Sequence, residues 1–239
     1  MGSTKNQRIL IISDTHFPFH HKDTFPFLEK LKREIKPDLV IHIGDEVDGH
    51  AWSFHTSETD SYGPDQELEL ALIEMKKLYK LFPAVHVMHS NHGSLHQRKA
   101  KEGQIPQRFI RSYREAFDAP PDWHWHSSYR TTLPNGEQVL FHHGMGANCI
   151  KSALDLGCSF VQGHHHGRLE ALQKFSPFNG KMIFGMTVGC LIDDKALSFR
   201  YNKTTSSRPK IGCGAILNGV PKPIPMLLNK KGRWTKKIC

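Results

Sequence analysis

The stretch Arg8-Ile9-Leu10-Ile11-Ile12-Ser13-Asp14-Thr15-His16 brings an apolar run and two polar ligand-type residues together. Its run of four aliphatic residues has the length of a strand and is followed at once by an aspartate and a histidine. Such runs are typical of parallel strands that are buried on both faces, and these strands present ligands at their carboxyl ends. Asp14 and His16 lie two positions apart, so on an extended segment they point to the same side and can bind one cation.

The first half of the chain continues with the pattern of an α/β fold. A segment with helical spacing separates the first apolar run from a second, which predicts a βαβ unit with a right-handed crossover. The second and third runs also end in polar residues, at positions 44–48 and 90–93. The expected elements are a helix from Asp23 or Thr24 to just before Pro37, a strand over 38–43, a helix from Pro64 and a strand over 84–89.

After Asp122 the sequence becomes rich in predicted strands. Residues 123–133 and 138–141 flank an Asn-Gly pair, which predicts a β-hairpin. Asn148 and Gly157 are of the residue types that begin and end a short helix. Further strands are expected at 159–162 and near 169–175, 181–188, 211–217 and 224–228.

The length and composition favour an intracellular globular protein. We expect one domain over residues 1–239, which is long enough to bury a core. No segment approaches the roughly 18 apolar residues of a membrane span, and the N-terminus lacks the apolar core of a signal peptide. Five widely spaced cysteines without a CxxC pair favour free thiols in a reducing compartment. We therefore expect a cytoplasmic location and no membrane partner, while the sequence leaves the oligomeric state open.

Basic residues are concentrated in two segments. The β-rich C-terminal part at about 195–239 has eleven Lys or Arg and no Asp or Glu, and subtracting eleven from the total net charge of +9 leaves about −2 for the other residues. A helical basic insertion at about 93–116, with breaks expected near Gly103 and Pro106, follows the third strand. The charge favours a polyanionic partner such as nucleic acid, but a solvated basic face explains it equally well.

Several of the seventeen histidines belong to the polar groups that follow the strands. A mixture of carboxylate, imidazole and amide ligands suits Mn, Fe, Zn or Ni better than calcium. The number of ligands exceeds that of one tetrahedral site, so two divalent metal ions that share Asp45 fit the sequence best. The residues at the strand ends are Asp14, His16, Asp45, Asp48, Asn91, His92, His143, His164 and His166.

The order of these residues resembles that of the calcineurin-like metallophosphoesterase superfamily. Its motifs read DxH, GDxxD, GNH(D/E), a later His before Gly, and GHxH. One such block would be weak evidence, but five in the same order are specific. Here the blocks are Asp14-Thr15-His16, Gly44-Asp45-Glu46-Val47-Asp48, Ser90-Asn91-His92-Gly93, His143-Gly144 and Gly163-His164-His165-His166.

The resemblance implies a four-layer αββα sandwich of two mixed β-sheets, with the active site along the sheet edges. It also implies a metal-bridging hydroxide that attacks phosphorus, with manganese as the expected metal. Asp48 would orient His92, which would stabilise the transition state or protonate the departing alkoxide. The implied metal ligands are Asp14, His16 and His166 for one ion, Asn91, His143 and His164 for the other, and Asp45 as the bridge.

Two positions depart from the family pattern. Ser90 replaces the glycine of GNH, and Gly93 replaces the acid that usually follows the histidine. Loss of this acid would weaken support around the metal ligands and lower activity or change the metal preference. All the ligand positions are kept, so we expect a working enzyme.

Other site residues are predicted from their positions next to these blocks. His142 competes with His143, but strand alternation sends only one inward and the family pattern places Gly directly after the ligand. The loop at 49–63 is either a wall of the substrate site or a packed surface loop. Candidates for contact with substrate phosphate are His20, His50, His55, His165, Arg98 and Arg108.

Three functions fit this sequence. The basic segments favour a phosphodiesterase that hydrolyses nucleic-acid or nucleotide phosphodiesters. The same metal core would serve a phosphomonoesterase that acts on a small molecule or a phosphoprotein. A non-catalytic binding module with this fold is the third reading, and only Gly93 favours it. The sequence does not identify the substrate, because the fold and the metals are common to all three.

Overall fold

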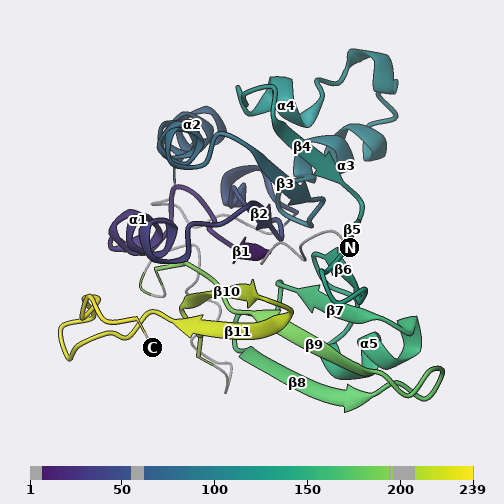
Figure 1. Cartoon of the computed structure of the whole chain (residues 1–239). Coiled ribbons are helices and arrows are strands. Elements are labelled where there is room, and N and C mark those ends of the chain that lie inside the picture. The colour runs from purple at the N-terminus through teal and green to yellow at the C-terminus, as the bar shows by residue number, and fades with distance from the viewer. Residues whose placement is uncertain (1–6, 55–61, 194, 196–207, 239) are drawn as a thin grey trace.

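The strands of the computed structural model form two sheets that pack face to face (Figure 1). The structure describes residues 7–54, 62–193, 195 and 208–238. In the first sheet, four parallel strands are extended at one side by an antiparallel hairpin from the C-terminal part of the chain. Its order is β11 (Val220–Pro225), β10 (Gly212–Leu217), β1 (Arg8–Ile12), β2 (Leu39–His42), β3 (Val85–Met88) and β4 (Trp123–His126).

The second sheet is also mixed. Its three inner strands are parallel to one another, and its two outer strands are antiparallel to their neighbours. A pair of sheets of this kind places the carboxyl ends of several parallel strands along one edge. The order is β5 (Tyr129–Thr132), β6 (Gln138–His142), β7 (Ser159–Gln162), β9 (Met182–Val188) and β8 (Leu169–Phe175).

Helices cover the outer faces of both sheets. Buried side chains of α1, α2 and α4 form one cluster with the outer face of the first sheet, and those of α5 pack on the second. The predicted four-layer αββα sandwich of two mixed β-sheets is therefore confirmed (Figure 1). The helices are α1 (Thr24–Ile35), α2 (Pro64–Leu81), α3 (Leu95–Glu102), α4 (Tyr113–Ala116) and α5 (Cys149–Leu156), with single 3₁₀ turns η1 (His50–Trp52) and η2 (Gln107–Phe109).

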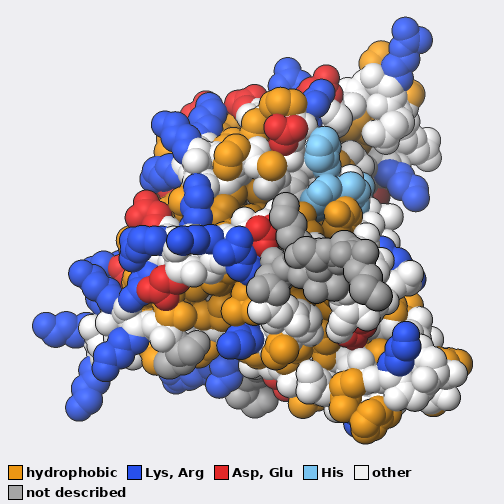
Figure 2. Space-filling view, viewed as in Figure 1, with side chains coloured by type: hydrophobic (Ala, Val, Ile, Leu, Met, Phe, Trp, Pro, Cys, Tyr) orange, Lys and Arg blue, Asp and Glu red, His pale blue; other side chains and the backbone are white. Residues whose placement is uncertain are grey.

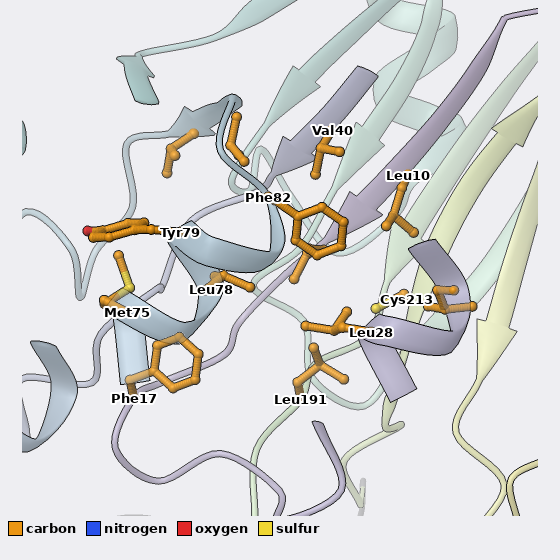
Figure 3. Packing of buried hydrophobic residues seen from close by; sticks show 14 of the residues in the cluster. Leu10, Phe17, Leu28, Val40, Met75, Leu78, Tyr79, Phe82, Leu191 and Cys213 are labelled. Atoms are coloured by element: carbon orange, nitrogen blue, oxygen red, sulfur yellow. The ribbon is translucent and has the colours of Figure 1, made fainter. Parts of the chain in front are cut away.

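Strand β1 is aliphatic throughout because both of its faces are buried. Ile9 and Ile11 lie in the cluster between the two sheets. Leu10 points the other way, into the cluster beneath α1 and α2 that also holds Leu28 and Phe82 (Figure 3). Each fully buried side chain of this size contributes about 1.5–3 kcal/mol. The strand is thus a firmly held base for the polar residues that follow it.

The predicted hairpin is wrong in its first strand. Residues 123–133 do not form one strand, because the chain passes from the first sheet to the second between β4 and β5. Trp123 is 1 % exposed and packs among the side chains beneath α2 and α4, which places β4 beside β3. Only β5 pairs with β6 across the Asn-Gly turn.

The last strand also differs from the prediction. β11 begins at Val220 rather than near 224, and it pairs with β10 across a tight turn at Asn218 and Gly219. Both turn residues have positive φ, 54° and 84°, which this Asn-Gly pair adopts more readily than other residues do. The sequence therefore contained the signal for this turn. The start of β11 was missed because the strand has three prolines, a residue that is uncommon inside strands.

The basic insertion is helical in two pieces, as predicted. Helix α3 is followed by Gly103, the turn η2 begins after Pro106, and Ser112 caps α4 with a reciprocal pair of hydrogen bonds to Glu115. On the face shown in Figure 2, Lys and Arg side chains lie over the insertion and also over α1 and the C-terminal segment. The organisation of residues 1–239 as one domain stays a prediction.

The described part of the chain can be compared with two expectations, the absence of a membrane span and the presence of free cysteines. None of its helices combines the length and apolar character that a membrane span needs. The described cysteines are buried and free, which agrees with the predicted thiols. They are Cys149, Cys158, Cys190 and Cys213, while Cys239 lies outside the described residues.

An ion pair fastens the C-terminal segment to the start of α1. Arg233 donates from Nε and Nη2 to the two carboxylate oxygens of Asp23, at 2.8 and 2.5 Å. The backbone N–H of Trp234 donates to the same carboxylate at 2.8 Å, and the Trp234 ring meets Phe27 edge-on. The Asp23 side chain is buried although Arg233 is half exposed.

We expect Asp23→Asn to lower the free energy of unfolding by about 1–2 kcal/mol at pH 7. Hydrogen bonding to Arg233 lowers the pKa of Asp23 to about 2. A depressed carboxyl pKa stabilises the fold above the unfolded value near 3.8 and ceases to do so as the pH falls toward 2. Urea unfolding at pH 7 and pH 3 should therefore show a smaller difference between parent and variant at pH 3. Asp155→Asn, in the exposed pair with Lys151, is the control and should have little effect.

Candidate metal centre

The polar residues that follow the parallel strands converge between the two sheets. Asp14 and His16 follow β1, and Asp45 follows β2. His164 and His166 come from the other sheet, after β7, and the backbone N–H of His164 donates to Asp14 Oδ2 at 3.1 Å. Groups about 150 positions apart in the sequence therefore meet at one point.

Asp45 lies at the middle of this cluster. Its Oδ2 is 3.5 Å from His16 Nε2 and 3.3 Å from His143 Nε2. Its Oδ1 accepts a hydrogen bond from the backbone N–H of His92 at 3.0 Å. Because one carboxylate oxygen faces histidines from both sheets, Asp45 is the residue that two bound ions would share.

One group of potential ligands lies on the β1 side of Asp45. His166 Nε2 is 3.1 Å from Asp14 Oδ1 and 3.2 Å from His16 Nε2. One ligand atom each from Asp14, His16, Asp45 and His166 lies within 4.8 Å of the others. These four residues include all three that the sequence assigned to the first ion.

A second group lies on the other side of Asp45. One ligand atom each from Asp45, His143 and His164 lies within 4.8 Å of the others. Asn91 Oδ1 is 2.8 Å from His143 Nε2, and His164 Nδ1 is 3.2 Å from the same nitrogen. The structure brings His143 into this group, whereas His142 Nδ1 accepts the backbone N–H of Gly144.

Two of the histidines are held so that Nε2 faces the cluster. His143 Nδ1 donates to the carbonyl of Ile43 at 2.9 Å, and His16 Nδ1 donates to Asp48 Oδ1 at 2.6 Å. Such bonds fix the ring orientation and the tautomer of a metal-binding histidine. Carboxylate, imidazole and amide donors in two groups around one shared carboxylate fit two divalent ions of the Mn, Fe, Zn or Ni type. The residues present therefore fit the dinuclear site that the sequence predicts.

Four of the cluster residues have left-handed backbone conformations. The φ angles of Asp14, His16, Asp45 and His164 are 49°, 46°, 51° and 63°. Residues other than glycine seldom adopt this conformation, which costs about 1 kcal/mol or more and is concentrated at functional sites. The strand ends are thus held in a strained form that turns these side chains toward one another.

The electrostatics of the cluster follow from burial among opposite charges. Burial alone would lower the pKa of His16, but hydrogen bonds to Asp14 and Asp48 raise it to about 10. In the same way, nearby Asp45 outweighs burial and raises the pKa of His143 to about 9. The histidines in turn hold the pKa of Asp45 well below its usual range despite burial. Divalent cations would replace protons in this cluster, so metal binding releases protons.

Asp48 contacts His16 and His92 through different atoms. Its carboxylate bonds to His16 Nδ1 and lies 3.8 Å from His92 Nδ1. His92 Nδ1 instead donates to the backbone carbonyl of Asp48 at 2.5 Å. Asp48 therefore orients both rings, but it acts on His92 through the main chain, which a sequence motif does not reveal.

The predicted histidine contacts to substrate are spread over different surroundings. His20 lies edge-on to Phe17 and Phe25, and its Nε2 is 3.6 Å from Glu74. His165 Nε2 donates to the Gly146 carbonyl at 2.9 Å, which ties it to a neighbouring loop. The backbone N–H of His50 bonds to Glu67. His55 lies outside the described residues.

A cavity of about 890 Å³ opens beside the second ligand group. Asn91, His143 and His164 form one side of it, and residues of the insertion, among them Arg98 and Lys101, form the other. The Arg98 guanidinium donates to the carbonyl of Asn91 at 3.0 Å and lies 5.0 Å from the Phe54 ring. The structure therefore places Arg98 at the cavity. Arg108 is exposed and is not one of the lining residues.

Two serines next to the ligand residues also hold the site together. The Ser90 hydroxyl accepts the backbone N–H groups of Asp45 and Gly93, at 2.8 and 3.1 Å. Ser90 thus replaces the family glycine and links the second and third strand ends. Ser13 donates to Asp14 Oδ2. The sequence shows a serine at both positions. It does not show which groups these serines bond to, because that depends on the geometry of the turns.

Mixed carboxylate and histidine clusters such as this one are the kind of site that metal-dependent hydrolases use. The family model described as calcineurin-like phosphoesterase matches residues 7–180. The chain belongs to the calcineurin-like phosphoesterase family, which confirms the resemblance read from its motifs.

Comparison with solved structures supports the fold alone. Vps29 from Chaetomium thermophilum has a TM-score of 0.51 and 12% identity, covering 100% of this chain and 95% of its own. Vacuolar Protein Sorting 29 from Cryptosporidium parvum has a TM-score of 0.46 and 13% identity, and the match covers 91% of this chain and 95% of that protein. The nuclease MPE from Pseudomonas putida has a TM-score of 0.37 and 12% identity, and the match covers 90% of this chain and 85% of that protein. No curated protein sequence matches significantly. One fold can serve several functions, so the site must decide the activity.

Proposed function

We propose that this protein is a dinuclear-metal phosphodiesterase that hydrolyses nucleic-acid or nucleotide phosphodiesters, with manganese as the preferred metal. The observation that carries the proposal is the arrangement of two ligand groups around Asp45, directly beside the cavity. The cavity volume lies within the range of about 300–1,000 Å³ that is typical of small-molecule sites. Its opening beside the basic insertion favours a substrate with a negatively charged backbone.

Each part of the site has a distinct task in this reaction. Two bound ions would supply a hydroxide at neutral pH and neutralise phosphoryl oxygens. Asp14, His16 and His166 would hold one ion, and Asn91, His143 and His164 the other, with Asp45 between them. The His92 side chain is 23% exposed, and its ring lies edge-on to the His16 ring with 4.7 Å between the ring centroids. His92 can therefore reach a phosphate bound at the metal centre. From there it donates a proton to the leaving oxygen or stabilises the charge of the transition state.

The preference between ester classes is tested with a bis-aryl and a mono-aryl phosphate in Mn²⁺. We expect kcat/KM to be at least about tenfold higher for the diester, which corresponds to about 1.4 kcal/mol of transition-state stabilisation. A preference for the monoester would assign the site to a phosphomonoesterase instead. Turnover of neither ester, with His92→Ala like the parent, would favour a non-catalytic binding module.

The nucleic-acid part of the proposal is tested with a single-stranded oligonucleotide. Lys101→Gln should weaken its binding and make the affinity less dependent on salt, because each phosphate contact that is lost reduces counterion release. Arg33→Gln on α1 removes the same kind of charge away from the cavity and is the control. Equal effects of the two substitutions would indicate general charge attraction and contradict a binding site at the insertion.

A further inference from the structure

Glu46 is a buried acid next to the candidate metal centre, and neither the motif nor the proposed mechanism gives it a role. Its side chain is completely buried. Oε1 accepts a hydrogen bond from Trp125 Nε1 at 2.9 Å, whereas Oε2 has no hydrogen-bond partner among the described residues. Burying a carboxylate with so few partners is costly. A structural reason for its presence is therefore needed.

The Glu46 carboxylate lies where a side chain at position 93 would begin. A Cβ atom added to Gly93 would be 2.9 Å from Glu46 Oε1 and 3.0 Å from Oε2. Gly93 has no positive φ, so its backbone conformation does not require glycine. The Ser90 Oγ atom would also be 2.9 Å from such a Cβ, so the close approach of Glu46 and of Ser90 together excludes a side chain here.

This contact lies on the turn that carries Asn91 and His92. The Ser90 hydroxyl accepts the backbone N–H of Asp45, which attaches the turn to the Asp45 loop, and that of Gly93, which closes the turn on itself. The backbone N–H of His92 makes a second attachment, to Asp45 Oδ1. The backbone carbonyl of Glu46 accepts from Phe17 N–H and from the Thr15 hydroxyl, each at 3.0 Å. Glu46 therefore contacts the ends of β1 and β3 and the Trp125 ring of β4 at once.

We infer that Glu46 is a positioning residue that supplies, from the Asp45 loop, the carboxylate missing at Gly93. Its side chain fills the space over Gly93 and is held by Trp125, so the turn carries Asn91 and His92 at a fixed distance from Asp45. The inference rests on the dinuclear site of the proposed function but not on its substrate. It explains how the site keeps its support although the acid after His92 is absent.

A double-mutant cycle on Mn²⁺ affinity tests this inference, with titration calorimetry and the electron paramagnetic resonance of bound Mn²⁺ as readouts. Glu46→Ala removes the support, and Gly93→Asp places a second carboxylate against the first. We expect each to weaken Mn²⁺ binding about 10–100-fold, as losses of outer support around metal ligands do. The double variant has one carboxylate in this space again, so its affinity should return to within about threefold of the parent.

Glu67→Ala is the matched control, because Glu67 is another buried acid, on α2, that accepts backbone N–H groups of His50 and Ala51. It should lower the melting temperature without weakening Mn²⁺ binding by more than about threefold. An equally large loss in Glu67→Ala, or a double variant no better than Gly93→Asp, would overturn the inference. If Glu46→Ala does not fold, the comparison of Gly93→Asp with the double variant decides.

The failure of the proposed function would look different. A parent that binds two Mn²⁺ ions and follows the cycle, but cleaves no ester, would contradict the proposed activity and leave the role of Glu46 intact. A parent that binds no Mn²⁺ would overturn both.

Discussion

Replacement of Asp45 by Asn is expected to lower diester hydrolysis in Mn²⁺ by roughly 10³-fold. Asp45 Oδ2 faces histidines of both ligand groups, so the substitution removes a charge from both ion positions while it keeps the shape of the side chain. A metal ion contributes several kcal/mol of charge stabilisation in a phosphoryl-transfer transition state, and about 4 kcal/mol corresponds to a thousandfold rate.

The same substitution should be visible without any substrate. The parent is stabilised by metal ions that bind only the folded state, by about 2.7 kcal/mol when the ion concentration is 100 times the dissociation constant. Asp45→Asn should lose most of the rise in melting temperature that Mn²⁺ produces, because neither ion retains its shared ligand. Asp155→Asn, on the exposed face of α5, is the control. Binding of two Mn²⁺ ions by Asp45→Asn within tenfold of the parent affinity would contradict a bridging role.

Replacement of His92 by Gln is expected to lower kcat about 10²–10⁴-fold and to change Mn²⁺ affinity little. His92 lies beside the first ligand group, but its Nδ1 is bonded to the Asp48 carbonyl and its backbone N–H to Asp45. Ligand atoms of His92, His16 and Asp48 also lie within 4.8 Å of one another, but the proposed function gives His92 the contact with the substrate and not a place among the metal ligands. Loss of a general acid or base typically costs this factor in rate.

The control for this prediction is the nearby His96. Its ring packs against Tyr113 and Phe117. His96→Gln should alter stability more than turnover. Equal rates for His92→Gln and the parent, or a loss of Mn²⁺ from His92→Gln as large as that in Asp45→Asn, would contradict the assigned role.

The fold class and most of the strand ends could be predicted from the sequence, because local patterns carry them. An unbroken aliphatic run reports burial on both faces, as Ile9 and Leu10 show by pointing into different clusters. Parallel strands deliver the residues after them to a common edge, so Asp14, Asp45 and His164 could be grouped before their distances were measured. The mixture of donors at that edge then indicated divalent metals.

Sheet pairing was harder to predict, because it depends on contacts between distant segments. Residues 123–133 have strand character throughout, yet the sequence does not reveal that Trp123 packs beneath the helices of the first sheet while Tyr129 pairs in the second. Both pairings satisfy the same local alternation. Only the packing of the whole molecule chooses between them.

By itself the sequence determined which residue types stand at the strand ends, and so the family and its metal chemistry. The tertiary structure decided which atoms they use. It directed the Asp48 carboxylate to His16 and brought Glu46 over Gly93, although positions 46 and 93 are far apart in the sequence. The physical reason is that hydrophobic periodicity is a property of neighbouring residues, whereas the filling of space around a buried charge depends on every segment packed against it.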